Sequence, residues 1–154
     1  MGDPSIISTI QGLSSIHEGV DGPEIWILFA ATCEKSAAMR RTIAASQTKL
    51  RVSWVPAPID GGQSDPATAR LVGAGLNDMD KAFAGDLSGL PAAGGAAARQ
   101  AQEIESDLAR RMFQATGRPL ATPTIVYRDP DGLIRVVRGA VGPELFARLA
   151  ADAR

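Results

Sequence analysis

The residue best suited to chemistry in this sequence is Cys33, its only cysteine. It follows the apolar, strand-favouring residues 25–29 and two alanines, and an alanine-rich helical pattern begins directly after it. The dipole and unpaired backbone N–H groups of a helix N-terminus stabilise a thiolate, the form of cysteine that attacks disulfides. The position of Cys33 therefore predicts a reactive thiol. The alternative is a buried, inert thiol that packs as a small apolar side chain.

Composition argues against several other classes of function. The 154 residues fit one domain that is long enough to bury a core. The net charge is −1 and the 16 Lys and Arg residues are scattered, so we expect no binding to nucleic acid or to anionic membranes. No apolar run approaches the ~20 residues of a membrane span. His17 is the only imidazole, so we expect no zinc site, and we expect no other cofactor.

The cellular compartment stays open at this point. Residues 1–4 have neither the basic nor the apolar region of a signal peptide. This fits a cytoplasmic protein, and it also fits the mature or shortened form of an exported one. A single cysteine cannot form an internal disulfide, so cysteine usage does not decide between these compartments.

The first part of the chain is expected to form an N-terminal helix and linker, residues 1–22, ahead of a main domain, residues 23–154. One amphipathic helix over residues 4–17 is predicted from apolar side chains at helical spacing: Ile6, Ile10, Leu13 and Ile16. The main domain then opens with the strand before Cys33 and the helix after it. Residues 50–56, rich in Val and Trp, predict a second strand.

A block of helices is expected at about residues 64–117. Residues 64–66, Ser-Asp-Pro, form a helix-start signal, since proline suits the first helical position. Apolar residues at helical spacing follow over 71–83 and 99–116. Between these two stretches, residues 87–97 are rich in Gly, Ala and Pro and predict a loop.

Two strands and a helix complete the chain. Residues 120–127 and 133–138 are apolar and β-branched, and the Asp131-Gly132 turn between them predicts a hairpin. Gly142-Pro143 then begins a last helix. The predicted order is β-α-β, a helical insertion, and β-β-α, with the first two strands parallel. This is an α/β protein with a thioredoxin-like arrangement.

Four segments carry a resemblance to a known family. They are FAATCEKS around Cys33, WVPAPIDGGQSDPATARLVGAG, ATPTIVYRDPDG and GAVGPELFARL. In order and spacing they are similar to the thioredoxin-fold catalytic domain of the periplasmic disulfide isomerases of the DsbC/DsbG type. The likeness covers roughly residues 25–151. It places FAATCEKS at the family's CxxC segment, and ATPTIVYRDPDG at its threonine–cis-proline strand and hairpin.

The resemblance implies roles for three residues. Cys33 is the implied nucleophile, and Pro123 is implied to follow a cis peptide bond. Thr122 would then lie beside the thiol, able to hydrogen-bond the sulfur. Its main-chain groups would pair with an extended substrate peptide. Protein or peptide thiols and disulfides are the implied partners, and the periplasm is the implied compartment.

Ser36 is where the sequence departs from the family, which has a second cysteine at that place. Here the motif is Cys-Glu-Lys-Ser, lined by Thr32, Glu34 and Lys35. Serine cannot form a disulfide, so oxidation that stores an internal disulfide is not expected. Chemistry with one thiol is what remains, with an external thiol or reductase completing the cycle. Ser36 can still donate a hydrogen bond to the thiolate and Lys35 adds a positive charge, whereas Glu34 opposes both.

Two functional hypotheses follow. In the first, the protein is a thiol–disulfide oxidoreductase or isomerase that uses Cys33 as its single nucleophile. In the second, it is a redox-inactive thioredoxin-fold module of a secretion or conjugation system, which binds an extended peptide beside Pro123. Both hypotheses require the same fold, so they differ only in the reactivity of the thiol.

Overall fold

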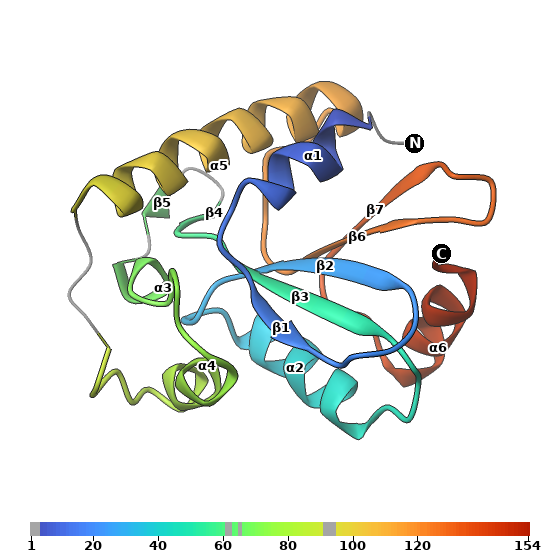
Figure 1. Ribbon diagram of the computed structural model, residues 1–154, viewed down its shortest axis with the longest axis horizontal. Helices are drawn as coiled ribbons and strands as arrows, with labels where there is room; N and C mark the ends of the chain where they lie inside the picture. The colour runs from blue at the N-terminus through green and yellow to red at the C-terminus, as the bar shows by residue number, and fades with distance from the viewer. Residues whose placement is uncertain (1–3, 61–62, 65, 91–94) are drawn as a thin grey trace.

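The computed structural model describes residues 4–60, 63–64, 66–90 and 95–154, which form a sheet between two layers of helices (Figure 1). Within the described residues the main sheet has the strand order β1-β3-β2-β6-β7. Strands β2 and β3 are parallel, and β6 and β7 form an antiparallel hairpin, as the sequence predicted. The strands are β1 (Ile16–Glu18), β2 (Glu24–Phe29), β3 (Arg51–Pro56), β6 (Thr124–Arg128) and β7 (Ile134–Arg138).

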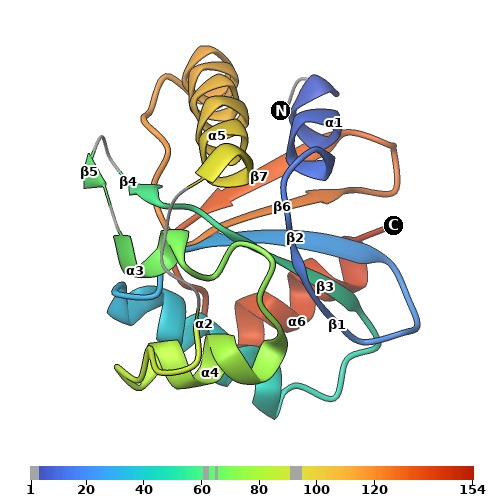
Figure 2. The same cartoon turned by 60° about the vertical axis from the view of Figure 1, so that its left-hand side comes forward.

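The helices divide between the two faces of this sheet (Figure 2). One face carries α2 (Glu34–Ala45), α4 (Leu76–Phe83) and α6 (Pro143–Asp152), and the other carries α1 (Ser5–Gln11) and α5 (Gly95–Thr116). A small two-stranded sheet, β4 (Ile59–Asp60) and β5 (Gln63–Ser64), leads into the predicted helical insertion, whose first helix is the short α3 (Pro66–Ala69). None of the helices in the described ranges has the length and apolar character needed to cross a membrane.

Strand β2 contributes to two hydrophobic cores, one on each face of the sheet. Successive side chains of a strand point to opposite faces, so a run of apolar residues can fill both. The first core combines alternate residues of β2 with α2, α4 and α6: Ile25, Ile27, Phe29, Met39, Met79 and Phe146. The second combines the intervening residues with α1 and α5: Trp26, Leu28, Ile6, Ile10, Leu108 and Met112. The strand that leads to Cys33 is thereby fixed from both sides.

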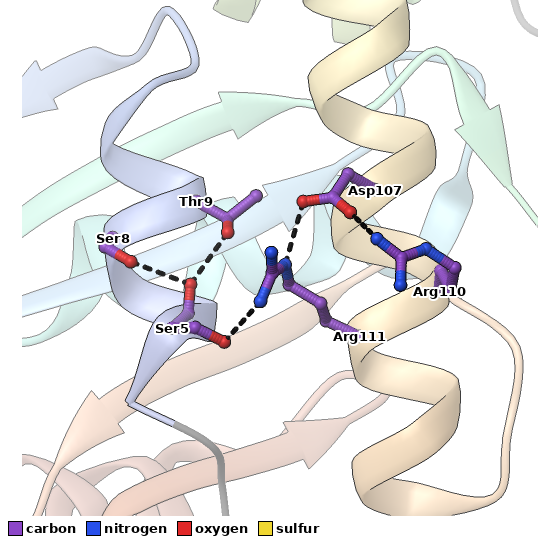
Figure 3. Close-up of polar contacts among 6 residues, drawn as sticks. All are labelled: Ser5, Ser8, Thr9, Asp107, Arg110 and Arg111. Carbon is purple, nitrogen blue, oxygen red and sulfur yellow. Dashed lines mark hydrogen bonds and ion pairs between the residues drawn. The ribbon is translucent and has the colours of Figure 1, made fainter.

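Helix α1 is attached to α5 by polar contacts as well as by the second core (Figure 3). Arg111 donates from Nη1 to Ser5 Oγ and from Nε to Asp107, each at 2.8 Å. Asp107 also pairs with Arg110 on the same helix. The carbonyl of Ser5 accepts hydrogen bonds from the hydroxyls of two residues one turn on, Ser8 and Thr9. The start of α1 is therefore anchored to the insertion.

The single helix predicted over residues 4–17 is wrong in its second half. Helix α1 ends at Gln11, and Ile16 belongs to β1, where it pairs with Trp54 of the neighbouring strand β3. Ile16 also packs in the core opposite to that of Ile6 and Ile10, so its helical spacing from them is coincidental. Two other predictions fall partly outside the described residues: Asp65 of the helix-start signal, and residues 91–94 of the predicted loop.

Candidate functional site

Cys33 lies at the junction between β2 and α2, as predicted. It is the residue immediately before the first turn of α2, with extended backbone angles (φ −91°, ψ 115°). Its N–H donates to the carbonyl of Ala30 (3.1 Å), and its own carbonyl accepts the N–H of Ala37 (3.1 Å). The thiol is half-buried. The first N–H groups of a helix have no partner within the helix, and those of Lys35 and Ser36 here hydrogen-bond the sulfur.

Ser36 lies fully buried beneath the thiol, with 0% of its surface exposed. Its Oγ accepts the backbone N–H of Ala30 at 3.3 Å. A serine hydroxyl has one proton to donate, and a hydrogen bond from this hydroxyl to Cys33 stabilises the thiolate. The side chain therefore connects the end of β2 with the sulfur.

Thr122 and Pro123 form the other side of the site. The peptide bond between them is cis, in accord with the sequence prediction. The sulfur of Cys33 lies 3.6 Å from the carbonyl oxygen of Thr122, to which the thiol donates, although 89 positions separate the two residues in the chain. The carbonyl of Pro123 accepts the N–H of Gly139 at 2.7 Å, which ties this loop to the end of β7. The main-chain groups of Thr122 were expected to pair with a substrate peptide, and one of them, the carbonyl, faces the thiol.

Opposing effects act on the thiol, and their sum lowers the pKa of Cys33 from its ordinary value. The largest single effect is partial burial, which raises the pKa because a charge is costly to desolvate. Hydrogen bonds together outweigh it: those of the Ser36 hydroxyl and backbone N–H, the Thr122 side chain and the Lys35 backbone N–H. The arrangement therefore favours the thiolate, the nucleophilic form of cysteine.

A groove of about 370 Å³ opens beside the thiol. Its lining comes from the start of α2 and from the end of α4 in the insertion: Ala31, Thr32, Cys33, Glu34, Ala37, Arg41, Ala82, Phe83 and Gly85. Of the residues expected to line the motif, Thr32 and Glu34 are exposed at this groove, and Lys35 is exposed next to them. The apolar part of the wall contains Phe83, which also contacts Phe29 with a ring-centroid separation of 5.5 Å.

Comparison with solved structures identifies the fold. A periplasmic thioredoxin-like protein from Salmonella enterica serovar Typhimurium aligns with 98% of this chain and 97% of its own, with a TM-score of 0.58 and 16% identity. The catalytic domain of Proteus mirabilis ScsC aligns with 96% of this chain and 93% of its own, with a TM-score of 0.59 and 12% identity. The chain has a thioredoxin-like fold. No protein-family model and no curated protein sequence matches it significantly.

The thioredoxin-like fold accounts for the meeting of Cys33, Ser36, Thr122 and Pro123, which the sequence predicted to lie together. At these sequence identities the likeness concerns the fold alone, so the DsbC/DsbG resemblance stays a prediction. Sequence reasoning missed the insertion's share of the site. Helix α4 supplies part of the groove, and Thr68 of α3 contacts the loop before Cys33. No motif marks either contribution.

Proposed function

We propose that this protein catalyses thiol–disulfide exchange with Cys33 as its single nucleophile. The observation that carries the proposal is the set of hydrogen bonds that lowers the pKa of this half-buried thiol beside Thr122. An inert, packed cysteine needs no such partners. A thiolate at a helix N-terminus, accessible from a groove, has the features of a reactive cysteine.

The first step of the proposed reaction is attack of the Cys33 thiolate on one sulfur of a substrate disulfide. A bond forms between Cys33 and that sulfur, the substrate S–S bond breaks, and the second substrate sulfur leaves as a thiolate. The thiol no longer carries a proton, so the Thr122 carbonyl loses its donor. That carbonyl then becomes an acceptor for a backbone N–H of the attached peptide, which is how an extended chain binds beside a strand end.

The second step requires a thiol from outside this site, because Ser36 has no sulfur. A thiolate of the substrate, or of an external reductant, attacks the mixed disulfide and forms a new disulfide, and the Cys33 thiolate leaves. When the attacking thiolate belongs to the substrate, the net result is isomerisation without a change in oxidation state. We therefore infer an isomerase-like activity on protein disulfides, in keeping with the DsbC/DsbG resemblance, in an oxidising compartment such as the periplasm.

The rate of Cys33 alkylation as a function of pH tests this proposal. We expect a midpoint below ~8.5, the ordinary value of a cysteine pKa, and rapid formation of a mixed disulfide with a small model disulfide. Scrambled disulfides of a substrate protein should then re-pair in the presence of the wild type and not of Cys33→Ser. A midpoint at or above the ordinary value, with no mixed disulfide, would contradict the enzymatic role and support the redox-inactive binding module.

A further inference from the structure

The helical insertion makes a direct hydrogen bond to the loop that carries the reacting thiol. The backbone N–H of Ala31 donates to Thr68 Oγ1 at 2.7 Å. Thr68 is on the short helix α3 and is fully buried, with 0% of its surface exposed, and Ala31 is only 7% exposed. In a buried environment an N–H without a partner is costly, so this contact fixes where the loop can lie.

Three backbone N–H groups between β2 and the thiol have a described acceptor, and each acceptor belongs to a different residue. The N–H of Ala30 meets Ser36 Oγ, that of Ala31 meets Thr68 Oγ1, and that of Cys33 meets the carbonyl of Ala30. Two of these three acceptors belong to the α2 junction itself. Thr68 is the one that belongs to the insertion, 37 positions away in the chain.

The insertion is in turn held in place around this contact. Arg70, two residues after Thr68, donates to the carbonyls of Leu87 (3.2 Å) and Leu90 (3.0 Å), in the segment that follows α4. Arg40 of α2 binds Asp80 of α4 at 2.9 Å. The residue directly after α3 is thus tied to the segment that follows α4, and α4 is tied to α2.

We propose that Thr68 is a positioning residue for the reacting thiol: its hydroxyl fixes the Ala31 N–H and, through it, the turn that places Cys33 at the start of α2. This inference rests on the proposed function of Cys33. The N–H groups of Lys35 and Ser36 stabilise the thiolate only where the sulfur faces them, so movement of the turn weakens them together. The insertion is then part of the reactive site and not an addition to its rim.

Thr68→Val tests the inference, because valine keeps the shape of threonine and removes the hydroxyl. In the folded variant we expect the midpoint of the alkylation profile to rise, with a roughly three- to tenfold slower reaction at about pH 6. Thr68→Ser should keep the wild-type profile. The matched control is Thr9→Val, which also removes a 2.7 Å hydrogen bond to the backbone, on the far face of the sheet. An unchanged midpoint in a folded Thr68→Val protein would overturn the inference.

A second measurement needs no Thr68 variant to fold. If the Ala31–Thr68 contact favours the thiolate, then ionisation of the thiol must strengthen that contact by the same factor. In the wild type, protection of the Ala31 amide against hydrogen exchange should therefore rise as the pH passes upward through the thiol midpoint. Cys33→Ser should show no such step. Absence of the step in the wild type would overturn the inference, whereas an ordinary wild-type thiol midpoint would contradict the proposed function itself.

Discussion

Replacement of Ser36 by alanine separates the two tasks of its hydroxyl. The first is to accept the N–H of Ala30, which is only 2% exposed. Loss of the partner of a buried N–H costs about 1–3 kcal/mol at any pH. The second is to stabilise the thiolate of Cys33. A hydrogen bond to a charged group contributes about 1.5–3 kcal/mol; we take the lower end because water competes at a half-buried sulfur. Loss of this hydrogen bond therefore raises the pKa of Cys33.

The pH dependence of the effect follows from the direction of the shift. In the folded wild type the pKa of Cys33 lies below its value of ~8.5 in the unfolded chain. The stabilisation is therefore complete above the unfolded value and is lost as the pH falls through the folded pKa. At a pH well below the alkylation midpoints of the wild type and of the variant, Cys33 is neutral in both proteins, and Ser36→Ala should lose only the Ala30 contribution. At a pH well above both midpoints it should lose about 1.5 kcal/mol more.

Urea unfolding at these two pH values, together with the alkylation profile, measures both parts. The matched control is Ser36→Ala in a Cys33→Ala background, where the loss should be the same at both pH values. If Ser36→Ala lowers the free energy of unfolding by the same amount at low and high pH in the presence of Cys33, and the alkylation midpoint does not move, then the hydroxyl does not stabilise the thiolate. The assignment of Ser36 to the reactive site would then be refuted.

Three further predictions test the site and its supports. Ser36→Cys supplies a second sulfur, so oxidised glutathione should convert the variant to a form with an internal disulfide, whereas the wild type should keep a mixed disulfide with glutathione. Mass spectrometry distinguishes the two products, and a glutathione adduct that persists on the variant would contradict the prediction. Arg40→Ala removes the ion pairs with Glu18 and Asp80 from a side chain that is 15% exposed. The substitution should lower the free energy of unfolding in urea by about 1–3 kcal/mol, between the values of exposed and buried ion pairs, and an unchanged free energy would contradict this prediction. Leu108→Ala, in the second core, should cost about 2–5 kcal/mol and leave the Cys33 alkylation midpoint unchanged, since Leu108 lies on the other face of the sheet. A moved midpoint would show that the two faces are coupled.

Local patterns predicted the central part of the fold. The apolar run before Cys33 and the alanine-rich run after it predict a strand followed by a helix, and the structure has β2 and α2 there. The Asp131-Gly132 turn likewise predicts the hairpin of β6 and β7, because glycine accepts the positive φ, here 81°, that the turn requires. In these places the local preference and the tertiary structure agree.

Other features depend on distant partners and leave no local pattern. The three residues of β1 are extended because the edge of β3 offers unpaired backbone groups, with Ile16 opposite Trp54. The contact between Thr68 and Ala31 is of the same kind. A threonine within a short polar segment is ordinary, and only the packing of α3 beside the end of β2 gives its hydroxyl a partner. The sequence thus predicted candidate residues around Cys33 and at Thr122 and Pro123, and it missed the contacts that the insertion makes with that loop.

The alternation of β2 between two cores restricts how this site can change in evolution. Deletion or insertion of one residue between Glu24 and Phe29 would exchange the side chains of the two cores. A change of two residues would keep the faces but move Cys33 by about 7 Å along the strand direction, away from the carbonyl of Thr122. Length is thus fixed here, and new chemistry can arise only by substitution.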